Sequence, residues 1–288
     1  MPPPERISYL GPAYSYTWEA AQCLIPDGGQ TVPKPTIAQI FSSVCQGEAG
    51  LGIVPFENSS NGSVHVTLDL LRDCIQGTYD SIQVKGEVQV PVRHCLAVKK
   101  SETTTTEIKK VYTHPQAWGQ CKTFLATLPQ ETERIDTSST SRAAELVAAS
   151  ADGDSVAAIC SRSAAKGYDL TISKEGIEDR PGNGTRFLVL EHSGRGSAPP
   201  APPEDGQVKS LIAFTVREDA PGALAAALAV FHNHGLNLTS INSRPSGESN
   251  WNYCFFVECV SPNTVLDVTM RDLGTSTREC KWLGSWKV

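Results

Sequence analysis

A run rich in glycine, serine and proline, residues 192–206, divides this chain of 288 residues into two parts. The run has no large apolar side chains that could pack into a core, so we expect it to be a linker. The lengths on either side, about 190 and about 80 residues, are both typical of folded domains. We therefore predict domains over residues 1–192 and 209–288, joined by a linker at 193–208.

Strand-like and helix-like segments alternate in the first part. Leu51–Phe56 and Val156–Cys160 are short apolar runs typical of buried strands. Residues 141–149 and 161–168 have helical composition, and Ile37 begins a further apolar pattern of helical period. This alternation predicts an α/β domain with a largely parallel sheet flanked by helices.

The second part follows a different pattern. Ile212, Phe214 and Val216 alternate as in a strand, and a helix is expected to begin near Gly222. Two further strands, a second helix and a last strand near residues 281–286 complete the order βαββαβ. That order is typical of a ferredoxin-like module. A module of this size favours regulation or subunit pairing over catalysis.

Charge and hydropathy exclude several classes of function. The 25 basic and 31 acidic residues give a net charge of −6, so we expect no nucleic-acid partner. The longest apolar run, Ala223–Phe231, is far shorter than the roughly 20 residues that span a bilayer, so we expect no membrane partner. The first residues lack a signal-peptide core, which predicts a cytoplasmic protein.

The nine cysteines are scattered and form no Cys-x-x-Cys pair. They suit free thiols in a reducing compartment better than disulfides or a zinc site. His232 and His234 have no acidic or sulfur-bearing neighbours. We therefore expect no metal.

Polar residues gather where the predicted strands end. In an open α/β sheet, ligands bind outside the carboxyl ends of the strands, where helices begin. Four segments occupy such positions: Gly11–Ser15, Glu57–Ser60, Thr113–Gln116 and Ser161–Ser163. Their hydroxyls and amides suit a small, oxygen-rich anion. The absence of G-x-G-x-x-G and Walker sequences argues against a nucleotide cofactor.

A glycine-flanked loop at residues 182–184 leads into an apolar strand and presents Thr185 and Arg186 at its start. Glycine lets a backbone approach a ligand closely, and arginine binds carboxylates through two parallel hydrogen bonds. Thr185 alone is most often just a β-strand residue. Arg186 is equally explained by a surface ion pair with Glu178 or Asp179.

The other candidates also have structural explanations. Gln116 lies three residues after Thr113 and suits a helix-capping box, which the spacing alone slightly favours over a ligand contact. Asn58 and Ser59 suit turns and caps as well as a binding site. The residues by themselves therefore indicate an anion-binding α/β protein with a regulatory module, and they indicate no reaction.

The chain resembles the prephenate dehydratase family in three segments that occur in the family's order. These are Gly52–Ser59 with Gly62–Val64, then His114–Gln116, then Thr185–Phe187. In the second part, Gly222–Leu224 followed by Ser243–Pro245 resembles the phenylalanine-binding ACT domain of that family. The resemblance covers nearly the whole chain outside the linker.

This resemblance implies a two-lobed catalytic domain like the periplasmic binding proteins, with its second lobe at roughly residues 92–176. It also implies a reaction: prephenate, a dicarboxylate, loses water and carbon dioxide to give phenylpyruvate on the route to phenylalanine. Aromatisation drives the reaction, so no cofactor is expected. Phenylalanine is implied as the feedback inhibitor, acting on a homodimer or homotetramer.

The resemblance also assigns roles to residues. Thr185 would donate a proton to the departing hydroxyl or position the group that does, and Arg186 would hold a carboxylate. Asn58, Ser59 and Gln116 would complete a hydrogen-bonding cage. Further substrate contacts are expected from Gly11, Ser15, Ser161 and Phe187. Phenylalanine contacts are expected from Gly222, Ala223, Leu224, Asn237, Asn242, Ser243, Arg244 and Pro245.

Two positions depart from the family pattern. Tyr14 stands where the first loop usually has a small residue, and Asn242 stands where a glutamate usually precedes Ser-Arg-Pro. These changes affect the expected fit of substrate and effector. Two alternatives remain open from the sequence. One is arogenate dehydratase, and the other is a non-catalytic sensor of amino acids or organic acids.

Overall fold

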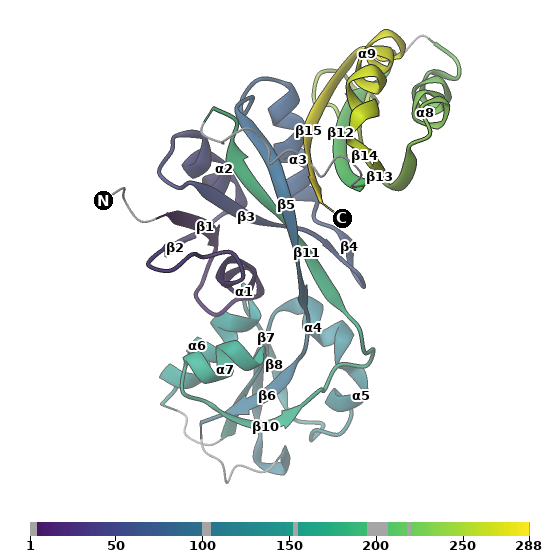
Figure 1. The fold of residues 1–288 in the computed structure, drawn as a ribbon. Helices are drawn as coiled ribbons and strands as arrows, with labels where there is room; N and C mark the ends of the chain where they lie inside the picture. The colour runs from purple at the N-terminus through teal and green to yellow at the C-terminus, as the bar shows by residue number, and fades with distance from the viewer. Residues whose placement is uncertain (1–4, 100–104, 152–154, 195–206, 218–219, 288) are drawn as a thin grey trace.

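The structure is a computed structural model that describes residues 5–99, 105–151, 155–194, 207–217 and 220–287 (Figure 1). The described residues form three sheets. Two belong to lobes of the first part, here called lobe 1 and lobe 2, and the third belongs to the C-terminal domain. The predicted linker at 193–208 lies mostly outside the described residues, and the first strand of the C-terminal domain begins at Gln207.

Lobe 1 contains a mixed sheet with the strand order β2-β1-β3-β11-β5, and β4 pairs with β3. Helix α1 covers one face of this sheet, and α2 and α3 cover the other. The elements are β1 (Arg6–Leu10), α1 (Tyr16–Gln22), β2 (Gln30–Lys34), α2 (Ile37–Cys45), β3 (Leu51–Asn58), β4 (Gly62–Ser63), α3 (His65–Ile75), β5 (Ile82–Pro91) and β11 (Gly184–His192).

Lobe 2 contains a five-stranded sheet with the order β10-β6-β9-β7-β8. Its strands run from Cys95 to Glu175, inside the range that the family resemblance implies. The elements are β6 (Cys95–Val98), the 3-10 helix η1 (Thr105–Glu107), β7 (Lys110–Thr113), α4 (Pro115–Gln120), α5 (Lys122–Leu125), β8 (Glu133–Asp136), α6 (Thr140–Ala149), β9 (Val156–Cys160), α7 (Arg162–Gly167) and β10 (Thr171–Glu175).

Two crossings of the chain join the lobes. Strand β5 leads out of lobe 1, and β11 returns to it beside β5 (Figure 1). Because β11 runs antiparallel to both β3 and β5, the sheet of lobe 1 is mixed. In lobe 2, β6 runs antiparallel to β9 and β10. In each sheet one long strand, β11 in lobe 1 and β6 in lobe 2, runs against the other four, so the expectation of a largely parallel sheet is correct apart from this one reversed strand per lobe.

The C-terminal domain has the predicted order βαββαβ and an antiparallel sheet ordered β13-β14-β12-β15. The elements are β12 (Gln207–Thr215), α8 (Ala223–Asn233), β13 (Asn237–Pro245), β14 (Tyr253–Pro262), η3 (Asn263–Val265), α9 (Leu266–Ser276) and β15 (Glu279–Lys287). The two-lobed α/β part followed by a ferredoxin-like domain is thus confirmed. Strand β14 begins at Tyr253, and Trp251, which precedes it, is 88% exposed.

Both faces of the C-terminal sheet are covered. Ile212 and Phe214 pack with helices α8 and α9. Their neighbours Leu211 and Ala213 point the opposite way and share a core with α2 and α3 of lobe 1. This alternation follows from the two-residue period of a strand. Lobe 1 and the C-terminal domain therefore form a continuous body, with α8 and α9 on its outer side (Figure 1).

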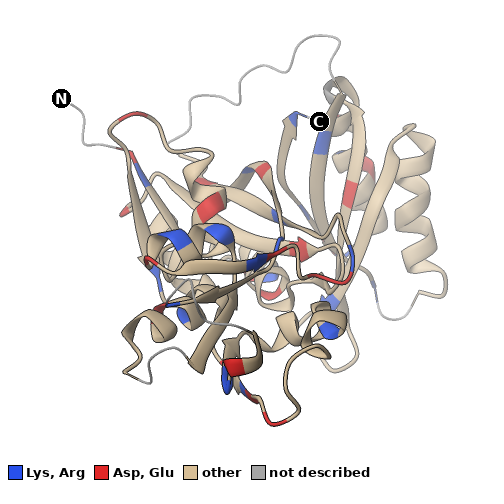
Figure 2. Cartoon of the chain, turned by 90° about the horizontal axis from the view of Figure 1, so that it is seen from below, with Lys and Arg blue, Asp and Glu red and all other residues tan. Residues whose placement is uncertain are grey.

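Charged residues of both signs are interspersed over the described chain (Figure 2). No helix among the described residues is long and apolar enough to cross a membrane. Within the same residues, no group of three or more histidine, cysteine or acidic side chains is arranged to hold a metal ion.

Strand β15 crosses β5 so closely that a side chain cannot fit at Gly284. A Cβ atom placed there would lie 1.9 Å from the carbonyl oxygen of Val84. We expect Gly284→Ala to lower the free energy of unfolding by about 1–3 kcal/mol, because the backbones must separate. Chemical denaturation measures this change.

Gly274→Ala in α9 is the matched control. Its Cβ atom would lie 3.8 Å from Cys280 Sγ, an ordinary contact. Alanine favours a helix over glycine by roughly 0.5–1 kcal/mol, so this variant should be as stable as the wild type or more stable. Equal stability of both variants and the wild type would contradict the close crossing.

Candidate active site

A hydrogen-bonded pair, Asn58 and Thr185, lies where β3 and β11 meet. The two residues face each other in the antiparallel register, and Asn58 Nδ2 donates to Thr185 Oγ1 at 3.0 Å. At the other end of the amide, Asn58 Oδ1 accepts from the backbone N–H groups of Ser60 and Asn61, each at 3.0 Å. Because both ends of the amide have partners, the orientation of Asn58 toward Thr185 is fixed.

Ser59 and Asn183 extend this arrangement. Ser59 Oγ donates to Asn183 Oδ1 at 3.1 Å and accepts from the backbone N–H of Gly184 at 3.0 Å. Asn58 Nδ2 also lies 3.0 Å from Asn183 Oδ1. Asn183 is buried, and its oxygen holds both neighbours. Asn183 was not predicted as a site residue, although the flanking Gly182 and Gly184 indicated a loop whose backbone can approach a ligand closely.

Thr185 points toward the face of the lobe 1 sheet that α1 covers. Phe187 and Val189, which share its side of β11, pack in one core with residues of α1. Phe187 is only 2% exposed, so it belongs to this core. The expectation that Phe187 contacts substrate does not agree with this burial.

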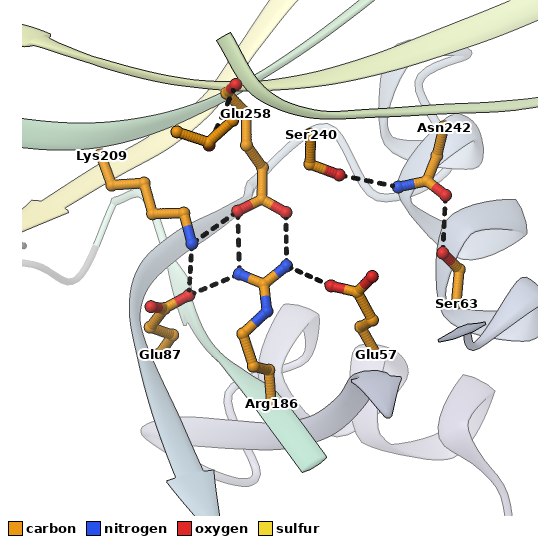
Figure 3. A network of polar contacts seen from close by, with 9 residues as sticks. Glu57, Ser63, Glu87, Arg186, Lys209, Ser240, Asn242 and Glu258 are labelled. Atoms are coloured by element: carbon orange, nitrogen blue, oxygen red, sulfur yellow. Dashed lines mark hydrogen bonds and ion pairs between the residues drawn. The ribbon is translucent and has the colours of Figure 1, made fainter. Parts of the chain in front are cut away.

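Arg186 points the other way, toward the C-terminal domain. Its Nη1 lies 2.8 Å from Glu87 and 2.8 Å from Glu258, and its Nη2 lies 2.7 Å from Glu57 and 2.6 Å from Glu258 (Figure 3). Burial alone would lower the pKa of Arg186, but its bonds to Glu258 and Glu57 outweigh this and raise the pKa. The guanidinium is therefore charged, and both its terminal nitrogens are occupied by protein carboxylates.

The expected substrate clamp at Arg186 is thus not what the structure shows. A surface pair with Glu178 or Asp179 is not what it shows either. The reason is strand alternation: consecutive residues on β11 face opposite sides of the sheet. If Thr185 faces the α1 side, Arg186 faces the side covered by the C-terminal domain.

The loop from Gly11 to Ser15 joins the two lobes. Ser15 is buried, and its hydroxyl caps α1 by accepting from Trp18 N at 3.2 Å and donates to Leu10 O at 3.1 Å. Tyr14 has a positive φ of 62°, and its ring packs edge-on against Trp18 and against Tyr168 of lobe 2. Ser15 is therefore a capping residue, and Tyr14 is a bridge between the lobes.

Gly11 occupies a tight position in the same loop. Its N–H donates to Lys34 O at 3.0 Å, and a Cβ atom at this position would lie 3.1 Å from Pro33 Cβ. The observed role of Gly11 is thus close packing against the end of β2.

Gln116 and Ser161 lie at the starts of two helices of lobe 2. His114 caps α4 by accepting from Gln116 N, whereas Thr113 donates to Ile159 O at 2.7 Å. The capping-box explanation is therefore wrong, and the Gln116 residue is exposed. Ser161 caps α7 by accepting from Ala164 N at 3.1 Å.

A cavity of about 610 Å³ lies between α1, the start of α7 and the segment that joins β5 to β6. Glu19, Ser161 and Ser163 are among the residues that line it. One carboxyl oxygen of Glu19 is buried without a hydrogen-bond partner. Burial raises the pKa of Glu19, and hydrogen bonds from the two serines offset only part of this rise. Glu19 did not stand out in the sequence, because it lies inside a helix with no motif around it.

The expected effector residues fall in two groups. Gly222, with a positive φ of 81°, is the N-cap of helix α8, whose first two residues are Ala223 and Leu224. On β13, Ser243 and Pro245 are exposed. Asn237 begins β13 and lies eight residues before Pro245. Within one subunit, Asn237 and Pro245 are therefore at opposite ends of the strand.

Asn242 and Arg244 face lobe 1. Ser63 Oγ donates to Asn242 Oδ1 at 2.6 Å (Figure 3). Arg244 forms two hydrogen bonds with Asp69, at 2.8 and 3.0 Å. Asn242 Nδ2 also donates to Ser240 Oγ at 3.3 Å, so the observed contacts of these two side chains are with lobe 1 and with β13 itself, in contrast to the expected direct contacts with phenylalanine.

Comparisons with known proteins cover both parts of the chain. The family model of prephenate dehydratase matches residues 7–195, and the ACT domain model matches residues 210–271. A bifunctional chorismate mutase/prephenate dehydratase of Pseudomonas aeruginosa is 35% identical over 286 residues, which cover 98% of this chain and 73% of that protein. A chloroplastic arogenate dehydratase/prephenate dehydratase 2 of Arabidopsis thaliana is 32% identical over 294 residues, with the same coverage of each.

A solved structure is also similar over nearly its whole length. It is the prephenate dehydratase from Arthrobacter aurescens in complex with L-Phe, which superposes with a TM-score of 0.85 at 27% sequence identity. The match covers 98% of this chain and 90% of that chain.

Glu19 makes stability depend on pH. A carboxyl whose pKa is raised by folding stabilises the fold below its unfolded pKa, and this contribution is lost as pH rises through the folded pKa. We expect Glu19→Gln to be more stable than the wild type at pH 8 and to depend less on pH above 5. Thermal unfolding at pH 5 and pH 8 measures this.

Glu48→Gln is the control for this prediction. Glu48 is exposed, and its bond to Lys34 lowers its pKa, so removing its charge cannot stabilise the protein at high pH. A Glu19→Gln variant less stable than the wild type at pH 8 would contradict the prediction.

Proposed function

This chain belongs to the prephenate dehydratase family, and we propose that it converts prephenate to phenylpyruvate, water and carbon dioxide. The observation that carries the proposal is the Asn58–Thr185 hydrogen bond, formed by residues from two of the family's signature segments. The chain is a lyase of aromatic amino acid biosynthesis with a C-terminal ACT domain.

We propose that Thr185 directs a proton toward the departing hydroxyl group. Because Thr185 Oγ1 accepts from Asn58, its own hydroxyl hydrogen is free to point at the substrate. A threonine hydroxyl is a weak acid, so the effect depends on the hydrogen-bonded network that includes Ser59 and Asn183. Asn183 acts in this proposal as the residue that orients both neighbours.

The carboxylates of the substrate need donors other than Arg186, whose terminal nitrogens face protein carboxylates. The proposed donor is neutral, the exposed Gln116 amide, because the Ser59 hydroxyl and N–H already donate to Asn183 Oδ1 and Gly184 O and so shape the network around Thr185. Orienting the dianion is the main task, since aromatisation provides the driving force. No cofactor is part of this proposal.

We propose that L-phenylalanine inhibits the enzyme by binding the ACT domain. The N–H groups that begin helix α8 suit its carboxylate, and the exposed Ser243 and Pro245 edge the same end of the sheet. Asn237 lies at the other end of β13, so it would reach a bound phenylalanine from a second subunit. This favours a homodimer or homotetramer.

Two alternatives remain. Arogenate dehydratase acts on the amino counterpart of prephenate, and the similarity to the Arabidopsis protein supports testing it. The ratio of kcat/KM on the two substrates decides between them. A sensor without activity would bind an amino acid or an organic acid and turn over neither substrate. The cytoplasmic location expected from the sequence remains a prediction.

Thr185→Val tests the catalytic proposal. Valine keeps the shape of threonine but removes the hydroxyl, so we expect kcat on prephenate to fall by about 100-fold or more. Thr185→Ser keeps a hydroxyl and is expected to retain more activity. Phenylpyruvate formation measures both. An unchanged kcat in a folded Thr185→Val variant would exclude this role, and no turnover by the wild type would favour the sensor.

Phenylalanine is expected to bind the purified protein and slow prephenate turnover. Asn237→Ala should weaken binding by about tenfold, the loss expected for one hydrogen bond to a charged group. Asn233→Ala, another exposed asparagine of the same domain, is the control. Calorimetry measures binding, and failure of the wild type to bind phenylalanine would remove the regulatory proposal.

A further inference from the structure

Glu258 of the ACT domain is the one buried acidic residue among those that the structure describes. Its side chain is 2% exposed and contacts Arg186 through both carboxyl oxygens, at 2.6 and 2.8 Å. Lys209 adds a third bond at 2.7 Å (Figure 3). Burial alone would raise the pKa of Glu258, but the bonds to Arg186 and Lys209 lower it, so the carboxylate is charged at neutral pH.

Stability alone does not explain a charge at this position. The neighbours of Glu258 on the same face of β14, Cys254 and Phe256, are apolar and pack into the core shared with lobe 1. Replacing a buried ion pair by apolar residues of similar size is often neutral or stabilising. A buried glutamate here therefore suggests that the position of its partner matters.

Arg186, the partner of Glu258, lies next to the proposed catalytic pair of Thr185 and Asn58. Arg186 faces Glu57 across the register of β11 and β3, and the next pair in the register is Thr185 with Asn58. Glu57 also bonds to the Arg186 guanidinium at 2.7 Å. Arg186 therefore ties β11 to β3 one residue from the Thr185–Asn58 hydrogen bond.

The ladder between β11 and β3 is irregular at this point, although the register of β11 with β5 is unbroken from Gly184 to Val189. The register of β11 with β3 shifts between Arg186 and Phe187. Such an irregularity interrupts the ladder and changes the direction of side chains nearby. The side-chain bonds of Arg186 consequently carry more of the alignment between β11 and β3 than they would in a regular ladder.

We propose that Glu258 is a positioning residue for the active site, supplied by the ACT domain and acting through Arg186 on the Thr185–Asn58 pair. This inference rests on the proposed dehydratase function. Glu258 also faces Ser240 on β13, two residues from Asn242. Strand β13, which bears the expected effector residues, therefore lies beside Glu258, and Glu258 binds Arg186 of β11.

Glu258→Gln tests the inference because it keeps the size of the side chain and removes its charge. We expect kcat on prephenate to fall by about tenfold or more, as a misplaced catalytic group predicts, while KM changes by less than about twofold. Glu258→Asp retains the charge and should recover part of the loss. Circular dichroism and thermal unfolding establish that each variant is folded.

Lys281→Met is the matched control. Lys281 also joins the ACT domain to lobe 1, donating to Cys74 O at 2.8 Å and Asp80 O at 2.9 Å, and both acceptors lie outside β11. We expect this variant to keep the wild-type kcat. An equal loss of kcat in Lys281→Met and Glu258→Gln would show that any loosening of the interface lowers activity, and it would overturn the specific role of Glu258.

A double-mutant cycle tests whether Glu258 acts through Arg186. The Glu258→Gln/Arg186→Gln variant should have the kcat of Arg186→Gln within about twofold, because the second change removes a contact already lost. Independent, multiplying losses would contradict the proposal. If Arg186→Gln does not fold, the same cycle with Glu57→Gln replaces it, since Glu57 holds the other side of the guanidinium.

The wild type measured in parallel separates the two hypotheses. If the wild type does not turn over prephenate, the proposed function fails. If the wild type is active and Glu258→Gln has an unchanged kcat, the function stands and the positioning role is wrong.

Discussion

The alternation of side chains along β11 organises the structure around the candidate site. Thr185 and Arg186 are neighbours in sequence, yet the two-residue period of a strand directs them to opposite faces of the sheet. One face carries the hydroxyl next to Asn58, and the other carries a guanidinium bound by three carboxylates. A single strand therefore belongs both to the site and to the interface with the ACT domain.

This arrangement gives the ACT domain a direct mechanical connection to the site. Its sheet packs on lobe 1 through a shared apolar core, and β15 crosses β5 without space for a side chain at Gly284. Asn242 and Arg244 add polar contacts with the segment around α3. Exposed residues and interface residues alternate along β13: Ser243 and Pro245 are exposed, whereas Asn242 and Arg244 contact lobe 1.

The contact between the lobes has a different character. Tyr14 adopts a left-handed backbone conformation, which costs an L-residue other than glycine roughly 1–2 kcal/mol. Its ring compensates by packing against Trp18 and Tyr168, and the latter belongs to lobe 2. Tyr14, which departs from the family pattern, thus adopts an unfavourable backbone conformation and forms an aromatic contact between the lobes.

Three features could be predicted from the order of the amino acids: the division into two parts, the βαββαβ order of the second, and the segments that meet at Asn58 and Thr185. These follow from composition, periodicity and short motifs, which are local properties. Other features depend on packing and appear only in the folded molecule: Arg186 binds Glu258, 72 residues away, Phe187 is a core residue, and Asn183 joins the site. Periodicity predicts that adjacent strand residues face opposite ways, but what covers each face depends on how distant segments pack.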